Sequence, residues 1–283
     1  MRLRSYIEVL KPERTLANVM TTAAGFLLAS AGNIDIGLLS ATIVGTTLIV
    51  ASACAVNNVT DKNVDAQMPR TKRRALVVGS LPVRQVVSLA VICGVIGFGL
   101  LITYVNWLTV LIGVVGYVDY VVLYAWTKRH TVHSTLVGTL SGSAPVVAGY
   151  VAVTGSLDLT AWLLALIMLF WQMAHFFAIG VYRVEDYRAG SLPIFSVVRG
   201  AAKTQRQTIM YTMLFLLAVA ALPLGGKVGA VFLIVMLPVT LFWLWRAFEP
   251  ATSTALWGRD MFGVSLLVLL ALCVMLAVAT VLP

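Results

Sequence analysis

A polar stretch over residues 57–74 carries the residue types best suited to chemistry, and it reads N-N-V-T-D-K-N-V-D-A-Q-M-P-R-T-K-R-R. It follows directly on a long apolar run. If that helix continues, Asn57, Asp61 and Asp65 fall at i, i+4 and i+8 and share one face, with Asn58 close to it. Carboxylates one turn apart, together with amide oxygens, form a group of hard oxygen ligands that Mg²⁺ accepts. The spacing therefore predicts a magnesium site made by Asn57, Asp61 and Asp65.

The sign of the charge reverses within the same stretch. Basic side chains follow Asp65 at Arg70, Lys72, Arg73 and Arg74. A metal can bridge carboxylates to a phosphate while guanidinium groups bind the remaining oxygens, so this order suits a magnesium-bound diphosphate. The alternative is a solvated loop whose basic residues only set membrane topology. The register of the acids and amides at the end of an apolar helix favours the site.

The composition is that of an integral membrane protein. Of 283 residues, 60% are hydrophobic and 11% charged, and the mean hydropathy is +0.95, whereas soluble domains carry about 25% charged residues. Cys54, Cys93 and Cys273 lie in apolar runs at unrelated spacings, which indicates small core residues rather than metal ligands or a disulfide framework. The N-terminus lacks the apolar core and cleavage site of a signal peptide, so we expect it to be retained.

Nine apolar runs predict an all-α bundle of nine transmembrane helices, in a single domain over residues 1–283. The predicted spans are 15–32, 37–57, 85–104, 107–127, 133–153, 159–180, 207–224, 228–246 and 261–281. When the Lys and Arg residues are sorted by connection, all but Lys227 fall on one side. This distribution argues against nucleic acid as the reason for the net charge of +9. The positive-inside rule places the N-terminus in the cytoplasm and the C-terminus outside the cell membrane.

Three further acidic residues are candidates for function. Glu185 and Asp186 follow the sixth predicted span, four helices after the first acidic group, and both groups lie on the cytoplasmic side. One site between the two groups is therefore geometrically possible. Asp119 lies in the middle of the fourth span beside Tyr120, where an ionisable residue indicates function by default. A cavity-facing acid with a tyrosine or backbone partner is the structural alternative for Asp119.

A series of motifs in order makes the chain resemble the UbiA superfamily of intramembrane prenyltransferases, and within it the heme-farnesylating branch. Asn57, Asn58, Asp61 and Asp65 match N-D-x-x-D-x-x-x-D, with Asn in the second position as in that branch, and Arg70, Thr71, Lys72 and Arg74 match R-T-K-x-R. Lys128 and Arg129 match K-R, and Gly138, Ser141, Gly142, Pro145 and Gly149 match G-x-x-S-G-x-x-P-x-x-x-G. Trp171, Gln172, Met173, His175 and Phe176 match W-Q-M-x-H-F, and Tyr182, Arg183, Asp186 and Tyr187 match Y-R-x-x-D-Y. The matches extend from residue 11 to about residue 200.

The resemblance implies transfer of the farnesyl group of farnesyl diphosphate to a vinyl group of heme b, with hydration, Mg²⁺ as cofactor and release of diphosphate. The implied catalytic residues are Asp61, Asp65, Arg183 and Asp186, and the implied substrate-binding residues are Asn58, Arg70, Arg74, Tyr120, Tyr124, Lys128, Arg129, His175 and Tyr182. Tyr120, Tyr124, Trp171 and Phe176 could stabilise carbocation character with their ring faces. His175 would contact the heme through its iron or a propionate, the alternative being a polar residue satisfied at a helix end. The expected partners are the lipid bilayer and a downstream heme-modifying enzyme or terminal oxidase.

Two alternatives compete with this function. Quinone-type members of the superfamily carry several aspartates in the second acidic motif, whereas this chain keeps Asp186 with Glu185 beside it, which favours the heme branch. A secondary transporter would place ionisable residues at the middle of the bilayer. Here nearly all charges lie at one interface, and Asp119 is the clear exception.

Overall fold

The structure, a computed structural model, describes residues 2–249 and 253–279. In chain order the helices are α1 (Arg2–Val9), α2 (Pro12–Ser30), α3 (Ile36–Thr60), α4 (Lys62–Gln67), α5 (Val83–Tyr104), α6 (Trp107–Val118), η1 (Asp119–Tyr124), α7 (Ala125–His130), α8 (Ser134–Thr154), α9 (Leu159–Tyr182), α10 (Val184–Ala189), α11 (Phe195–Arg199), α12 (Ala201–Ala221), η2 (Leu222–Gly225), α13 (Ala230–Phe248) and α14 (Thr254–Val278). No strand occurs in the described ranges, so the all-α prediction is confirmed.

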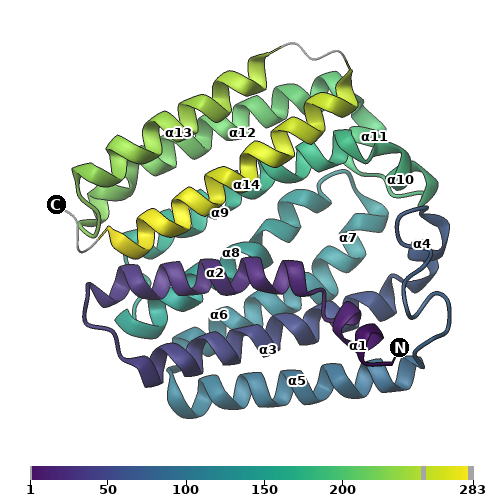
Figure 1. Ribbon diagram of the computed structural model, residues 1–283, viewed down its shortest axis with the longest axis horizontal. Helices are drawn as coiled ribbons and strands as arrows, with labels where there is room; N and C mark the ends of the chain where they lie inside the picture. Colours follow the sequence, from purple (N-terminus) through teal and green to yellow (C-terminus); the bar gives the residue numbers. More distant parts are fainter. Residues whose placement is uncertain (1, 250–252, 280–283) are drawn as a thin grey trace.

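Eight helices of the described residues are long and apolar enough to cross a membrane, and α6, η1 and α7 count among them as one continuous helix. The remaining predicted span corresponds to α2, whose polar first turn, beginning Pro12-Glu13-Arg14, lowers its hydropathy. α2 packs against α8 and α14. In Figure 1, α1 and the C-terminal end of α14 lie at opposite ends of the bundle. Opposite ends require an odd number of crossings, so α2 completes the predicted nine.

Two predicted boundaries are wrong because hydropathy marks the bilayer rather than the helix. The span predicted at 261–281 is the helix α14, which begins earlier, where Ser253 Oγ accepts a hydrogen bond from Leu256 N at 3.2 Å. The span predicted at 207–224 is α12, which begins directly after Gly200, in the left-handed region at φ +80°. α12 carries Lys203 in its first turn, and α14 carries Arg259 in its second turn, which lowers the hydropathy of both beginnings.

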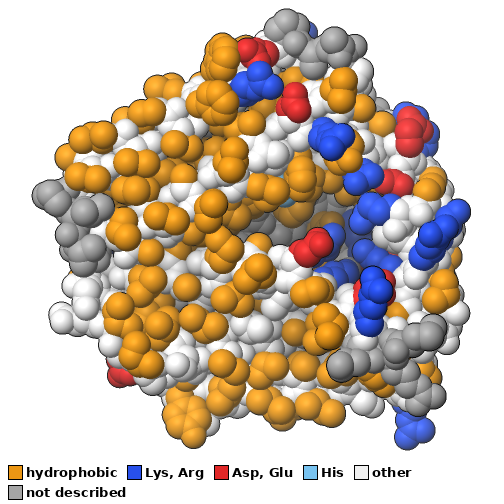
Figure 2. All heavy atoms as spheres, viewed as in Figure 1, with side chains coloured by type: hydrophobic (Ala, Val, Ile, Leu, Met, Phe, Trp, Pro, Cys, Tyr) orange, Lys and Arg blue, Asp and Glu red, His pale blue; other side chains and the backbone are white. Residues whose placement is uncertain are grey.

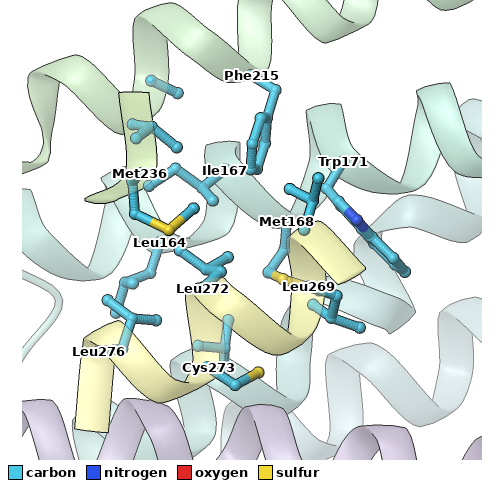
Figure 3. Packing of buried hydrophobic residues seen from close by; sticks show 14 of the residues in the cluster. Leu164, Ile167, Met168, Trp171, Phe215, Met236, Leu269, Leu272, Cys273 and Leu276 are labelled. Carbon is cyan, nitrogen blue, oxygen red and sulfur yellow. The ribbon is translucent and has the colours of Figure 1, made fainter. Parts of the chain in front are cut away.

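Large side chains fill the half of the bundle built from α9, α12, α13 and α14. Trp243 and Phe215 are fully buried with their rings in an edge-to-face arrangement, and Met236 and Ile167 pack beside them. Figure 3 shows Leu269, Leu272 and Leu276 of α14 turned into the same cluster. This apolar packing holds α9 against α12 and α14.

The crossing of α2 and α8 depends on small residues instead. A Cβ atom at Gly149 would collide with the carbonyl oxygen of Thr22, and one at Gly25 would collide with the carbonyl oxygen of Val146. The two backbones therefore touch, as in many pairs of membrane helices with small residues at their interface. This contact fixes the height of α2, which carries Arg14 and follows directly on Lys11, two basic residues of the site described below.

The Gly149→Ala substitution should therefore destabilise the protein. An added methyl group would separate α2 from α8, and overpacking of this kind costs about 1–3 kcal/mol of unfolding free energy. Gly99→Ala is the matched control, because nothing lies within 4 Å of a Cβ atom at Gly99. Thermal unfolding in detergent should show a lower midpoint for Gly149→Ala than for the control. Equal midpoints would mean that the helices can separate without cost.

Candidate active site

Charged side chains gather at one end of the bundle, which we call the basic end. It is formed by α1, α4, α7, α10 and the connections that follow α4 and α10, at the right of Figure 1. Figure 2 shows a hollow on the face turned to the viewer. Hydrophobic side chains surround it, and Lys and Arg side chains lie along its edge toward the basic end. The predicted sorting of basic residues to one side agrees with this arrangement.

Asp61 lies where the helix predicted to continue through residue 65 is interrupted. α3 ends at Thr60 and α4 begins at Lys62, although Asp61 N still donates to Asn57 O at 3.0 Å and Asp65 N to Asp61 O at 2.8 Å. The backbone bonding of a helix is thus kept across the junction. The Asp61 side chain meets two cations from α7: Lys128 Nζ is 2.5 Å from Oδ2, and Arg129 Nη2 is 3.0 Å from Oδ1.

Asp65 makes a separate contact. Its carboxylate is 2.5 Å from Arg74 Nη1, and its carbonyl oxygen accepts a hydrogen bond from Thr71 Oγ1 at 2.9 Å. The residue is buried, with 4% of its surface exposed. These bonds fold the connection after α4 back over the end of α3. Asp61 and Asp65 therefore belong to one site, but each has its own basic partner.

The second acidic group contacts the basic connection that follows the first acidic group. Asp186 lies 3.8 Å from Arg70 and 3.9 Å from Arg183, so it bridges the connection after α4 and the end of α9. The Arg183 guanidinium lies over the ring of Tyr182 at 4.2 Å. Glu185 instead forms an exposed pair with Arg188 at 2.6 Å and takes no part in the bridge.

The two asparagines differ in what they do. Asn57 is buried, its Oδ1 accepts a hydrogen bond from Lys11 Nζ at 2.6 Å, and its Nδ2 has no partner. Asn58 Nδ2 donates to Val9 O at 2.8 Å and to Cys54 O at 2.9 Å. Asn58 thus fastens the end of α1 to α3, a role that the sequence did not indicate. A contact between Asn58 and substrate stays a prediction.

Lys11 and Arg14 are site residues that the sequence reasoning missed. Lys11 adopts a left-handed backbone conformation (φ 51°). The pKa of its amine is lowered to about 7, mainly by burial and to a lesser extent by the nearby charge of Arg14. Arg14 Nη1 donates to Tyr120 Oη at 3.4 Å. Neither cation forms an ion pair with a carboxylate in the described residues. Two basic residues immediately before the first apolar run were the available signal.

The site therefore holds more positive than negative charge. Three carboxylates face seven basic side chains, which are Lys11, Arg14, Arg70, Arg74, Lys128, Arg129 and Arg183. A cleft lined mainly by one sign of charge concentrates ligands of the other sign. This arrangement suits an anion with several oxygens.

The donor set fits Mg²⁺ only if the ligand supplies part of the coordination. No group of three or more His, Cys, Asp or Glu side chains placed to hold a metal occurs in the described ranges. Asp61 and Asp65 offer carboxylate oxygens, and Asn57 offers an amide oxygen. Because Mg²⁺ is commonly held by one or two carboxylates together with water and substrate phosphates, these residues suffice for a shared metal.

Aromatic side chains stand between the charged site and the bundle interior. Tyr120 and Tyr124 stack with ring centroids 5.7 Å apart, and Lys128 Nζ lies 5.4 Å from the centroid of the Tyr124 ring. Trp171 is buried and stacks on His175 at 4.6 Å, whereas Phe176 is 43% exposed. The predicted aromatic residues thus form two groups, one on η1 and one on α9.

His175 lies well inside α9 rather than at a helix end, so the helix-end alternative is wrong. Its Nδ1 is 2.7 Å from Ser265 Oγ, and Ser265 Oγ is 2.6 Å from Phe262 O. A carbonyl oxygen can only accept, so the serine hydroxyl donates to it and must accept from His175 Nδ1–H. His175 Nε2 is then the unprotonated ring nitrogen, and among the described residues the imidazole forms its hydrogen bond through Nδ1 alone.

Comparison with known proteins assigns this arrangement to a family. Residues 18–266 match the UbiA prenyltransferase family. The chain belongs to the UbiA prenyltransferase family. It is therefore a membrane-embedded prenyltransferase, as predicted. A curated UbiA-type relative, protoheme IX farnesyltransferase 1 of Shewanella frigidimarina, is 41% identical over 280 residues, which is 98% of this chain and 92% of that protein. The protoheme IX farnesyltransferase of Pseudomonas savastanoi pv. phaseolicola is 42% identical over 281 residues, covering 98% and 95%.

Solved UbiA structures share the fold at low sequence identity. A digeranylgeranylglyceryl phosphate synthase superimposes with a TM-score of 0.78 at 18% identity, covering 98% of this chain and 99% of that one. A UbiA homologue from Archaeoglobus fulgidus, bound to GPP and Mg²⁺, gives a TM-score of 0.75 at 14% identity, covering 96% and 99%. At these identities the likeness establishes the bundle architecture only.

Proposed function

We propose that this UbiA family member transfers the farnesyl group of farnesyl diphosphate to a vinyl group of heme b, with addition of water, giving heme O and diphosphate. The observation that carries the proposal is the excess of basic side chains at the site, including Lys11 and Arg14, which form no ion pair with a carboxylate of the described residues. The hollow in Figure 2 has Lys and Arg side chains along its edge. They supply the anion site that a prenyl diphosphate needs. Relatives about 40% identical over nearly the whole chain carry the name protoheme IX farnesyltransferase, which supports heme as the acceptor.

Ionisation of an allylic diphosphate leaves its electron pair on the departing diphosphate oxygen. Basic groups aimed at that oxygen stabilise the charge as it develops. Lys128 and Arg129 approach from α7, Arg70 and Arg74 from the connection after α4, and Lys11 from the α1–α2 junction. Mg²⁺ held by Asn57, Asp61 and Asp65 would neutralise further negative charge on the leaving group. Arg183 and Asp186 close the site from the end of α9.

Carbon–carbon bond formation then takes place on the apolar side of this clamp. The vinyl π electrons attack C1 of the farnesyl cation, and the positive charge moves to the carbon beside the porphyrin ring. Water adds there and loses a proton, leaving the hydroxyl group. The rings of Tyr120 and Tyr124 stack with nearly parallel planes, at 14°, and can stabilise cationic carbon over their faces. Burial of Trp171 restricts water on the α9 side.

The state of His175 favours iron over a propionate as its contact with heme. A neutral imidazole whose other nitrogen is fixed by a hydrogen bond is the usual form of a metal-ligating histidine. The Ser265–Phe262 chain fixes that form here. A propionate, in contrast, would need a donor at Nε2. We therefore assign His175 Nε2 to the heme iron and Tyr182 with Arg183 to the polar edge of the substrates.

This assignment predicts a selective loss of affinity. His175→Ala should weaken heme b binding at least about tenfold, because an axial nitrogen ligand is lost, but should leave the affinity for metal-free protoporphyrin IX unchanged. Ser265→Ala should give an intermediate loss, since the tautomer is released but the imidazole remains. Visible absorption titrations of the purified variants would measure both affinities and the iron ligation state. An equal loss for both porphyrins would instead indicate a contact with the porphyrin edge.

We also propose the orientation of the protein. The basic end would face the cytoplasm of a cell membrane, because Lys and Arg are retained on that side of membrane proteins. Farnesyl diphosphate would then place its charged group at the cytoplasmic interface and its chain in the apolar hollow. A charged thiol reagent that cannot cross the membrane, applied to intact cells with single cysteines placed before α2 and after α14, would report the sidedness of each end.

Mass spectrometry of the products tests the proposed reaction. Purified protein in lipid would be incubated with farnesyl diphosphate and heme b, with and without Mg²⁺. A farnesylated, hydrated heme formed only with the metal is the expected result. Prenylation of an added aromatic acid without any heme product would assign the chain to the quinone-type members. Failure to release diphosphate with any acceptor would overturn the enzyme assignment and make transport the function to test.

A further inference from the structure

The helix that carries Lys128 contains an uncommon turn. Between the α-helical segments α6 and α7, residues Asp119–Tyr124 form the π-helix η1. π-Helical turns are rare, take one additional residue into the turn and occur mostly at functional sites. Since each residue of an α-helix turns the chain by about 100°, the additional residue rotates everything after it by about that angle.

The contacts between η1 and α8 show what this rotation does. A Cβ atom at Gly116 would touch Ala144, and a Cβ atom at Gly138 would touch the ring of Tyr124. Gly116 and Tyr124 thus face the same side of α8, although they are eight residues apart. In a regular α-helix they would point about 80° away from each other. The π turn removes this offset and keeps the Tyr124 ring against α8.

Asp119 is the first residue of the π turn, and it provides the polar contact in this interface. It is 1% exposed, and its Oδ2 accepts a hydrogen bond from Ser141 N at 3.0 Å. The other oxygen, Oδ1, is buried without a partner, and Asp119 forms no ion pair in the described part of the chain. A carboxyl group in this position is expensive. An ionisable residue of this kind indicates a function. The π turn that Asp119 begins carries side chains of the site.

Three groups of the prenyl-diphosphate site follow Asp119 on the same helix. Tyr120 Oη accepts from Arg14, the rings of Tyr120 and Tyr124 stack, and Lys128 lies over Tyr124 while its Nζ meets Asp61. The direction in which each of these side chains points depends on the rotation set by the π turn. Asp119, bonded to the backbone of α8, is the point at which that rotation begins.

We propose that Asp119 is a positioning residue for prenyl transfer, which holds the π turn against Ser141 N so that Tyr120, Tyr124 and Lys128 face the reacting diphosphate. The proposal rests on the proposed function for its effect on turnover. The conformational part is independent of the reaction. Without the Asp119–Ser141 bond, η1 relaxes toward an α-helix and Tyr124 turns away from α8 toward the lipid.

A labelling experiment tests the conformational part without any substrate. Tyr124→Cys would be introduced into protein whose three buried native cysteines are replaced, and its reaction with a water-soluble maleimide would be timed in lipid vesicles. Adding Asp119→Ala should slow labelling at least about fivefold as position 124 turns to lipid, since the rotation approaches 100°. Asp119→Asn keeps an acceptor oxygen and should label at the unmodified rate. Equal rates for Asp119→Ala and the unmodified protein would overturn the proposal, whatever the protein catalyses.

A double-mutant cycle tests the link to catalysis. Asp119→Ala should lower kcat at least about tenfold, because small misplacements of catalytic groups cost that much or more, whereas Asp119→Asn should stay within about threefold. In a Tyr124→Leu background the same Asp119→Ala change should cost less than it does in the unmodified protein, because the part of its effect that passes through Tyr124 is already lost. Val122→Ala, on the exposed side of the π turn, is the control and should retain activity. Fully additive losses would reduce Asp119 to a structural residue and overturn the proposal. Absence of farnesylated heme with unmodified protein would instead refute the proposed function and leave the labelling result standing.

Discussion

Asp61→Asn is expected to lower farnesyl transfer at least about 100-fold while the protein stays folded in the membrane. Loss of one preorganised electrostatic group costs about this much in other enzymes. The Asp61→Asn substitution removes two interactions. A carboxylate ligand to Mg²⁺ is lost, and Lys128 and Arg129 lose the partner that holds them 2.5 Å and 3.0 Å away. Asp65→Asn should be similarly inactive, because Asp65 is buried and holds Arg74 over the site.

Glu185→Gln is the matched control for these carboxylates. Glu185 lies at the same end of the bundle, but its side chain is 78% exposed and pairs only with Arg188. Its replacement should leave turnover and metal dependence unchanged. Turnover would be measured over a range of Mg²⁺ concentrations, with circular dichroism to check folding. Near-normal activity of Asp61→Asn or Asp65→Asn at limiting Mg²⁺ would show that the metal assignment is wrong.

The bundle and the outline of the site could be predicted because both depend on local sequence patterns. Apolar runs mark membrane spans directly, and Asp61, Asp65 and their basic neighbours lie within one short stretch. The partnership of Asp186 with Arg70 was also accessible, since both follow helices that end on the same side. The interruption of the helix at Asp61 was not predicted, because the apolar pattern ends before Asp61 and gives no information on the course of the helix beyond that residue.

Other parts of the site depend on contacts between distant segments. Ser265, which fixes the tautomer of His175, lies 90 residues along the chain, beyond the motifs that end at about residue 200. The π turn at Asp119 leaves no signature in an apolar sequence, because one additional residue does not disturb a helix that is hydrophobic all round. Lys11 and Arg14 resemble topology signals until the structure places them against Asn57 and Tyr120.

Lys11→Met should raise the dissociation constant for a prenyl diphosphate at least about 30-fold. Lys11 would then be a determinant of substrate binding and not only a residue that sets membrane topology. Removal of one member of a buried charged pair costs about 2–5 kcal/mol, and each 1.4 kcal/mol is a factor of ten. Asn57 Oδ1 offers Lys11 an oxygen but no compensating charge. A bound diphosphate supplies that charge, so the lysine stabilises the complex more than the free protein.

The affinity would be measured by calorimetry with a non-ionising thiodiphosphate analogue of farnesyl diphosphate. Lys203→Met is the matched control, because Lys203 is exposed on the first turn of α12 and forms no ion pair among the described residues. It should bind like the unmodified protein. Lys11→Arg should recover most of the affinity, since the positive charge is kept. Equal affinity of Lys11→Met and Lys203→Met would mean that the diphosphate lies nearer α7 and that Lys11 only fixes Asn57.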